Sequence, residues 1–168
     1  VEAGAGAVVT KSVGPYEREG YPNPTIVEVE CGFLNAVGLP NAGIRHFCKE
    51  ITEAKALGVP VIVSIYGHTP NEYTKVGAIA VEAGAAALEL NVSCPNVKEG
   101  GIEFGSNPIT LASLVKKVKK VAGSTTLIVK LSPNVTDVTA PTKAAIDNGA
   151  DVISLINTVR GMAIDIGT

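Results

Sequence analysis

The chain has 168 residues, of which 46% are hydrophobic and 18% are charged, and its formal net charge is −2. This composition argues against a disordered chain, and the lack of a basic excess argues against a protein that binds nucleic acid or a membrane surface. Three scattered cysteines cannot form a disulfide framework, which favours a reducing compartment, and no run approaches the roughly 18 apolar residues of a membrane span.

The length fits a single domain, since one domain usually takes about 100 to 200 residues. The chain begins at Val1 rather than at a methionine, and its first residues lack the basic, apolar and small-residue regions of a signal peptide. It ends at Thr168 in a stretch that does not resemble a natural terminus. We therefore expect residues 1–168 to form one partial domain of a longer protein.

Short runs of Val, Ile and Leu alternate along the chain with segments of helical periodicity. Such alternation predicts parallel βαβ units, because strands buried on both faces read as continuous apolar runs. In chain order we expect a strand at 7–10, a loop at 14–24, a hairpin or edge strand at 25–30, a loop at 32–43, a helix at 44–57, a strand at 60–65, a helix at 70–84, a strand at 86–91, a loop at 92–107, a helix at 108–122, a strand at 126–131, a helix at 136–148 and a strand at 151–156.

Five core strands are thus predicted in an α/β fold. The intervals between the last four are close to the roughly 30 residues of one unit in a (β/α)8 barrel. A closed barrel needs eight strands, and a doubly wound open sheet is the alternative arrangement for five. No G-x-G-x-x-G follows a strand and no G-x-x-x-x-G-K-[ST] occurs, which disfavours the nucleotide sites defined by those motifs.

Polar side chains follow each predicted core strand at the point where the strand ends. The carboxyl ends of the strands form the ligand-binding face of parallel α/β folds. Loop capping explains one such residue, but two lysines need another explanation, because lysine is depleted in strands and needs a partner when buried. We therefore interpret this rim as a binding site, formed by Thr10, Lys11, Ser64, Asn91, Lys130, Asn157 and Thr158.

Cys94 lies in the loop after the strand that ends at Asn91, close to this rim. It is either a reactive thiol or a small apolar residue, and Cys31 and Cys48 fit the second interpretation. The cysteines and histidines show no metal-ligand spacing, so no metal site is predicted. Glu89 is a charged residue inside a strand, and we expect it to pair with a lysine or to face a neighbouring layer.

Four motifs follow one another along the chain. They are Gly-Phe-Leu-Asn-Ala-Val-Gly-Leu-Pro-Asn at 32–41, Asn-Val-Ser-Cys-Pro-Asn at 91–96, Lys-Leu-Ser-Pro-Asn-Val-Thr-Asp at 130–137, and Ile-Asn-Thr followed by Gly-Met-Ala-Ile-Asp at 156–165. The second motif resembles the signature loop of the class 1 dihydroorotate dehydrogenases, and the first resembles their substrate loop. The other two resemble the class 1B branch, the catalytic subunit of the NAD-linked enzyme.

The resemblance implies a (β/α)8 TIM barrel that binds FMN at the carboxyl ends of its strands, with the first strand before Val1 and the last two βα units after Thr168. Those last units carry the phosphate site of FMN in this family, so we expect residues 1–168 alone neither to fold stably nor to hold FMN tightly. The implied reaction oxidises (S)-dihydroorotate to orotate in pyrimidine biosynthesis. Cys94 is implied as the general base that removes a proton from C5, while a hydride leaves C6 for flavin N5.

The resemblance also assigns residues to the two ligands. Lys130 would place a positive charge beside the flavin ring, and Lys11 would reach both flavin and substrate. The implied substrate residues are Lys11, Asn35, Ala36, Val37, Gly38, Leu39, Asn91, Asn96, Asn157 and Thr158, and the implied FMN residues are Lys11, Ser12, Ser64, Asn91, Lys130 and Ile156.

The class 1B resemblance implies a partner subunit that carries FAD and a 2Fe–2S cluster and passes the electrons to NAD. It further implies a homodimer of the catalytic subunit within a heterotetramer, located in the cytoplasm. Two alternatives remain open. A class 1A enzyme that uses fumarate is disfavoured by the motifs at 132–134 and 161–162, and a non-catalytic barrel fragment is disfavoured by the presence of Lys11, Cys94 and Lys130.

Overall fold

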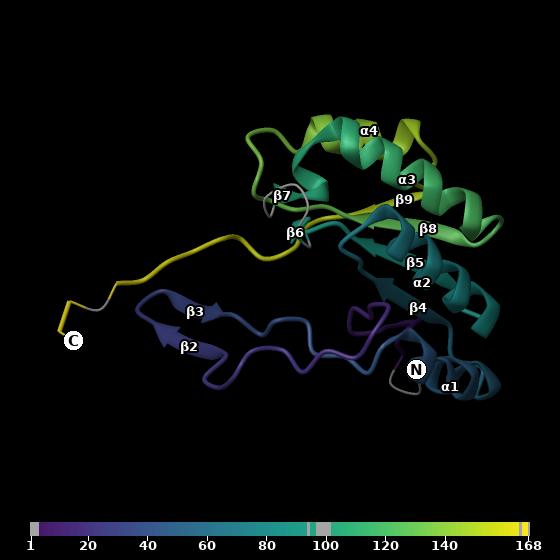
Figure 1. Cartoon of the computed structure of the whole chain (residues 1–168), viewed down its shortest axis with the longest axis horizontal. Helices are drawn as coiled ribbons and strands as arrows, with labels where there is room; N and C mark the ends of the chain where they lie inside the picture. The colour runs from purple at the N-terminus through teal and green to yellow at the C-terminus, as the bar shows by residue number, and fades with distance from the viewer. Residues whose placement is uncertain (1–3, 94, 97–101, 165, 168) are drawn as a thin grey trace.

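The computed structural model describes residues 4–93, 95–96, 102–164 and 166–167. Its centre is a five-stranded sheet in the order β1-β4-β5-β8-β9, and every neighbouring pair of strands is parallel (Figure 1). The five core strands expected from the sequence are therefore confirmed. They are β1 (Val8–Val9), β4 (Val61–Ile65), β5 (Ala87–Asn91), β8 (Thr126–Lys130) and β9 (Val152–Ser154).

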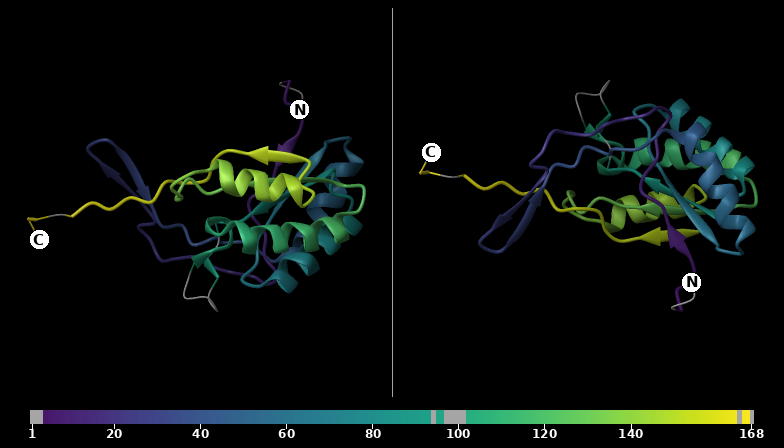
Figure 2. Two further views of the ribbon diagram at one scale, coloured as in Figure 1. Left: turned by 90° about the horizontal axis from the view of Figure 1, so that it is seen from above. Right: turned by 90° about the horizontal axis from the view of Figure 1, so that it is seen from below.

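Four helices cover one face of the curled sheet, as the views in Figures 1 and 2 show. They pack against one another in chain order. A doubly wound sheet carries helices on both faces, whereas the wall of a (β/α)8 barrel carries them on the outside alone. The arrangement is that of a partial (β/α)8 barrel, as predicted. The helices are α1 (Ile44–Ala56), α2 (Pro70–Ala83), α3 (Pro108–Ala122) and α4 (Thr139–Asp147).

The two faces of the sheet differ in chemistry because successive side chains of a strand point to opposite sides. The face toward the helices is apolar, and six of its side chains are 0% exposed: Val63, Ile65, Leu88, Leu90, Leu127 and Val129. The opposite face is polar near the carboxyl ends of the strands. There Ser64 is in register with Glu89, and Asn91 is in register with Lys130.

Local capping explains where the two longest helices begin. Thr69 Oγ1 accepts a hydrogen bond from the backbone N–H of Glu72 at 3.2 Å, at the N-terminus of α2. Asn107 Oδ1 accepts from the backbone N–H of Ile109 at 2.9 Å, at the N-terminus of α3. Each cap is followed by a proline, whose missing N–H costs nothing in the first turn. Both helix starts were predicted correctly.

Two expectations about the loops were wrong. Residues 32–35 form strand β3 (Gly32–Asn35), which pairs with β2 (Ile26–Val29) in an antiparallel hairpin that projects from the sheet (Figure 1). The predicted loop 92–107 also contains a short antiparallel pair, β6 (Pro95–Asn96) and β7 (Ile102–Glu103), and a 3-10 turn over Phe104–Ser106. Antiparallel pairing forms both hairpins despite the Gly, Pro and Asn content of these segments.

Helix α4 begins at Thr139, three residues later than expected. Asp137 Oδ1 accepts from the backbone N–H of Thr139 at 2.9 Å, and its carboxylate also accepts from the Thr139 hydroxyl at 2.7 Å. These hydrogen bonds hold the pKa of Asp137 below its ordinary value. The side chain therefore competes for the backbone at the point where the helix was expected to have started.

Within the part of the chain that the structure describes, no helix combines the length and the apolar character that crossing a bilayer requires.

Candidate functional site

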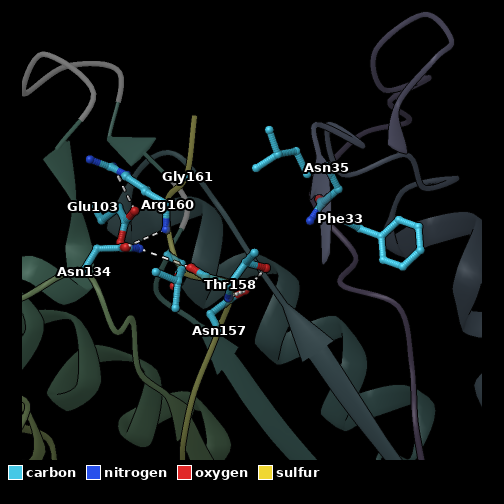
Figure 3. A pocket seen from close by; sticks show the side chains of 11 residues that line it. Phe33, Asn35, Glu103, Asn134, Asn157, Thr158, Arg160 and Gly161 are labelled. Carbon is cyan, nitrogen blue, oxygen red and sulfur yellow. Dashed lines mark hydrogen bonds and ion pairs between the residues drawn. The ribbon is translucent and has the colours of Figure 1, made fainter. Parts of the chain in front are cut away.

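A pocket of about 430 Å³ lies where the β2–β3 hairpin approaches the segment that follows β9 (Figure 3). Its volume falls within the range of about 300 to 1,000 Å³ that is usual for small-molecule sites. In Figure 3, Asn35 lies on the hairpin side and Glu103 on the opposite side. The described residues that line the pocket are Phe33, Leu34, Asn35, Ser93, Glu103, Asn134, Asn157, Thr158, Val159, Arg160 and Gly161.

Three residues predicted to bind substrate line this pocket together. Asn35 ends strand β3 of the hairpin, whereas Asn157 and Thr158 follow the last strand of the sheet. The Thr158 backbone N–H donates to Asn157 Oδ1 at 2.8 Å, which holds the Asn157 side chain against its own backbone segment. Segments more than 100 residues apart in sequence therefore meet at one cavity.

Asn91 lies directly behind Asn157. Its Oδ1 accepts from Asn157 Nδ2 at 3.1 Å and from the Ser93 backbone N–H at 3.3 Å. Asn91 is 7% exposed and is not among the described residues that line the pocket. The structure therefore places it as a support of Asn157.

The predicted flavin residues Ser12 and Ser64 continue this network on the polar face of the sheet. Asn91 Nδ2 donates to Ser12 Oγ at 2.9 Å, and the two serine hydroxyls are 3.0 Å apart. Ser64 Oγ donates to Glu89 Oε1 at 3.0 Å. Glu89 is 7% exposed, and this partner is a serine, whereas we expected Glu89 to pair with a lysine or to face a neighbouring layer. Four predicted site residues are thus joined across the ends of three strands and the segment after β9.

The two lysines of the rim differ in their surroundings. Lys130 is half-buried, ends β8, and is in register with Asn91 on one side and Ser154 on the other. Lys11 is exposed and follows β1 by two residues. Lys130 therefore lies on the polar face beside the Asn91 network, while Lys11 lies at the edge of the sheet. Ile156, the remaining predicted flavin residue, is 48% exposed in the segment after β9.

The backbone around the predicted substrate residues 35–39, within the motif at 32–41, is fixed by hydrogen bonds. Leu39 adopts a φ of 56°, which is rare for a residue with a large side chain. Asn41 fixes the neighbouring backbone, since its Nδ2 donates to the Leu39 carbonyl and its Oδ1 accepts from the Gly43 N–H, both at 2.9 Å. Ala36 is exposed, and its N–H donates to the Thr25 carbonyl at 2.8 Å. Of the predicted substrate residues 35–39, only Asn35 lines the pocket among the described residues, and Phe33 and Leu34 of the same motif at 32–41 line it as well.

Several residues that line the pocket were not predicted as site residues. Glu103 is 8% exposed, and its Oε1 accepts from the Arg160 guanidinium at 2.9 Å (Figure 3). Asn134 Oδ1 accepts from the Arg160 backbone N–H at 2.9 Å, and its Nδ2 donates to the Thr158 carbonyl at 3.3 Å. Ser93 Oγ and Glu103 Oε2 are buried and have no hydrogen-bond partner among the described residues. Asn134 belongs to a motif noted in the sequence, whereas nothing in the sequence singled out Glu103 or Arg160.

Two predictions concern side chains that the structure does not describe. Cys94 lies outside the described residues, and so does the side chain of Asn96. Their neighbours are described: Ser93 lines the pocket, and Pro95 begins strand β6. The loop that carries the predicted general base therefore starts at the pocket wall.

Comparison with known proteins gives a consistent result. The family model described as dihydroorotate dehydrogenase matches residues 1–168. The chain is 48% identical to the protein named "Dihydroorotate dehydrogenase B (NAD(+)), catalytic subunit" of Maridesulfovibrio salexigens, over 96% of this chain and 53% of that protein. It is 49% identical to the protein of the same name from Methanosarcina mazei, over 98% of this chain and 52% of that protein. The chain thus spans about half the length of the curated relatives it matches.

A relative from Aquifex aeolicus is provisionally named dihydroorotate dehydrogenase A (fumarate), and it is 49% identical over 96% of this chain and 53% of that protein. Among solved structures, the HMG-CoA lyase of Brucella melitensis is similar with a TM-score of 0.54, at 14% identity, over 67% of this chain and 40% of that chain. At this identity the likeness concerns the fold alone.

Proposed function

Because the chain belongs to the dihydroorotate dehydrogenase family, we propose that it supplies the substrate pocket of an FMN-dependent oxidoreductase that converts (S)-dihydroorotate to orotate in pyrimidine biosynthesis. The observation that carries this proposal is the convergence of Asn35, Asn157 and Thr158 on one pocket. Asparagine side chains offer both N–H donors and carbonyl acceptors. They suit a planar ring that presents carbonyl oxygens and N–H groups side by side, as dihydroorotate does.

The polar face of the sheet fits FMN by the chemistry of its donors. Lys130 offers ammonium donors there, and Asn91 keeps one Nδ2 proton beyond the one it donates to Ser12. These donors match the oxygen and nitrogen acceptors of a flavin ring, while the oxygens of Ser12 and Ser64 can accept from its ring N–H. Bound FMN would supply the two-electron acceptor of the reaction. Lys11 and Ile156 are further proposed contacts.

The proposed chemistry at the substrate is a paired removal of a proton and a hydride. The Cys94 thiolate takes the proton from C5, a hydride leaves C6, and the C5=C6 double bond of orotate forms. The loop position of Cys94, one residue after the pocket residue Ser93, supports this role. Asn35, Asn157, Thr158 and the proposed contacts Lys11, Asn91, Asn96 and 36–39 would hold the ring and exclude water.

We expect a variant with Asn157→Ala to bind orotate about tenfold more weakly than the unmodified protein, because one hydrogen bond is lost and Asn91 Oδ1 loses a donor. The measurement is a calorimetric titration of orotate. It uses the protein encoded by the complete gene, which we call the complete gene product. Asn148→Ala is the matched control, since Asn148 Nδ2 donates to the Ala144 carbonyl on α4, away from the pocket. Equal orotate affinity in the Asn157 variant and the control would refute the assignment of this pocket.

The electron acceptor separates two versions of the proposal. The names of the Maridesulfovibrio and Methanosarcina relatives, which include NAD(+) and a catalytic subunit, support NAD as the acceptor and a separate partner subunit. We propose that this partner carries FAD and a 2Fe–2S cluster, within a cytoplasmic heterotetramer built on a catalytic homodimer, as the class 1B resemblance implies. The Aquifex relative supports fumarate as the alternative. We expect the complete gene product to reduce NAD when the partner subunit is added, and fumarate reduction without that subunit would establish the alternative.

A further inference from the structure

The hydrogen-bond chain behind the pocket runs in one direction. Ser64 donates its only hydroxyl proton to Glu89 Oε1 at 3.0 Å, so the 3.0 Å bond between the serine hydroxyls uses the proton of Ser12. Ser12 Oγ in turn accepts from Asn91 Nδ2 at 2.9 Å. Every donor in this hydrogen-bond chain points toward Glu89, whose carboxylate accepts the last of these bonds.

This direction fixes which way the Asn91 amide faces. Its Oδ1 accepts from Asn157 Nδ2 at 3.1 Å and from the Ser93 N–H at 3.3 Å. A reversed amide would set its NH2 group against these two donors and would draw the Ser12 proton away from Ser64. The network therefore supports a single orientation of Asn91.

Two hydrogen bonds orient Asn157, one to Asn91 and one from the Thr158 backbone. One Nδ2 proton of Asn157 is donated to Asn91, and its Oδ1 accepts from the Thr158 N–H at 2.8 Å. The second Nδ2 proton has no acceptor among the described residues, and Asn157 lines the pocket. At this place the pocket thus offers an N–H donor, which pairs with a carbonyl oxygen of a ligand.

We propose that Glu89 is a positioning residue, whose carboxylate sets the orientation of the Asn91 and Asn157 amides through the Ser64 and Ser12 hydroxyls. The inference rests on the proposed function, because the oriented amide serves the carbonyl-bearing ring of the substrate. Glu89 is not among the described residues that line the pocket, so it acts through these intermediates alone.

The burial of Glu89 supports this role. A carboxylate that is 7% exposed is costly unless hydrogen bonds compensate for the lost water. Its register neighbours are Ser64 and Ile128. Because Ile128 is apolar, an apolar side chain at position 89 would have a neighbour to pack against. A carboxylate acceptor at position 89 fixes the direction of the hydrogen bonds that run from Asn91 through the two serines. An apolar residue at this position could not fix it.

The test compares orotate affinity by calorimetry in variants of the complete gene product with FMN bound. We expect Glu89→Leu to weaken orotate binding by about tenfold or more, since Asn91 loses the acceptor chain that orients it and Asn157 is then held by the Thr158 N–H without a fixed Asn91 partner. Glu89→Gln should stay within about threefold of the unmodified protein, because its amide oxygen still accepts from Ser64. Glu72→Gln is the control, since Glu72 accepts from the His68 N–H near α2 and lies outside the site.

If Glu89→Leu fails to fold, the double variant Ser64→Ala, Glu89→Leu removes the Ser64 donor and the Glu89 acceptor together, which costs less stability than removing the acceptor alone. The same loss of orotate affinity is expected in it, measured on protein saturated with FMN because Ser64 is itself a proposed FMN contact. Unchanged affinity in the Leu variants would overturn the inference, and so would an equal loss in Glu89→Gln. Absence of orotate binding in the unmodified protein would instead overturn the proposed function, and this inference with it.

Discussion

Replacement of Cys94 by serine is expected to slow dihydroorotate oxidation by about 10²- to 10⁴-fold at pH 7, which is the usual contribution of a general base. A thiol ionises near pH 8.5 and supplies thiolate at neutral pH, whereas a serine hydroxyl has no such tendency. Orotate affinity should change little, because the pocket residues remain in place. Steady-state rates and an orotate titration on the complete gene product measure the two effects.

Cys48→Ser is the matched control for this experiment. Cys48 lies on α1, its thiol donates to the Ile44 carbonyl at 3.1 Å, and burial raises the pKa of the thiol above its ordinary value. The control should keep the unmodified rate. If Cys94→Ser oxidises dihydroorotate as fast as the control does, then Cys94 is not the base.

Replacement of Lys130 by methionine is expected to weaken FMN binding by about tenfold to a hundredfold, the effect of losing one charge-assisted hydrogen bond. Methionine keeps the apolar stem of the side chain, so the change removes the charge while β8 and its register with Asn91 are kept. The measurement is the dissociation constant of FMN, taken from the quenching of its fluorescence on binding.

Lys117→Met is the control for the loss of a positive charge, since Lys117 is exposed on α3. It should bind FMN as the unmodified protein does. Equal FMN affinity in the two variants would show that Lys130 does not contact the flavin.

Strands β4 and β5 could be predicted from the sequence because they are buried on both faces or nearly so. Val61–Ile65 is apolar except for Ser64, and Ala87–Asn91 is apolar except for Glu89 and the final Asn91. Helix starts could be predicted at Thr69 and Asn107, where a capping residue stands directly before a proline. These signals are local, so they do not depend on the rest of the fold.

Strand β3 could not be predicted in this way. Gly32–Asn35 stands in a stretch rich in Gly, Pro and Asn, and it becomes a strand only by pairing with Ile26–Val29. The start of α4 was missed because the Asp137 side chain takes the Thr139 N–H. In both places a specific partner outweighs the composition of the segment.

The candidate site shows the same contrast between residues that local sequence signals predict and residues that depend on long-range partners. The strand-end rule predicted Ser64, Asn91 and Asn157, which the structure joins in one hydrogen-bonded network with Ser12. The Glu103–Arg160 ion pair was not predicted, because its members are 57 residues apart and neither lies at the end of a core strand. The hydrogen bonds that link Asn91 to Glu89 through the Ser12 and Ser64 hydroxyls were likewise not predicted, because they join segments far apart in sequence.

Binding of FMN and orotate to the complete gene product is the most direct test of the central claim. The protein is purified, and its flavin content is determined from the absorbance spectrum. Orotate affinity is then measured by titration, and the conversion of dihydroorotate to orotate is followed in a separate assay. We expect one FMN and one orotate per chain, together with dihydroorotate oxidation that is about 10²- to 10⁴-fold slower in a Cys94→Ser variant. A folded protein that holds no flavin, binds no orotate and leaves dihydroorotate unchanged would contradict the proposal.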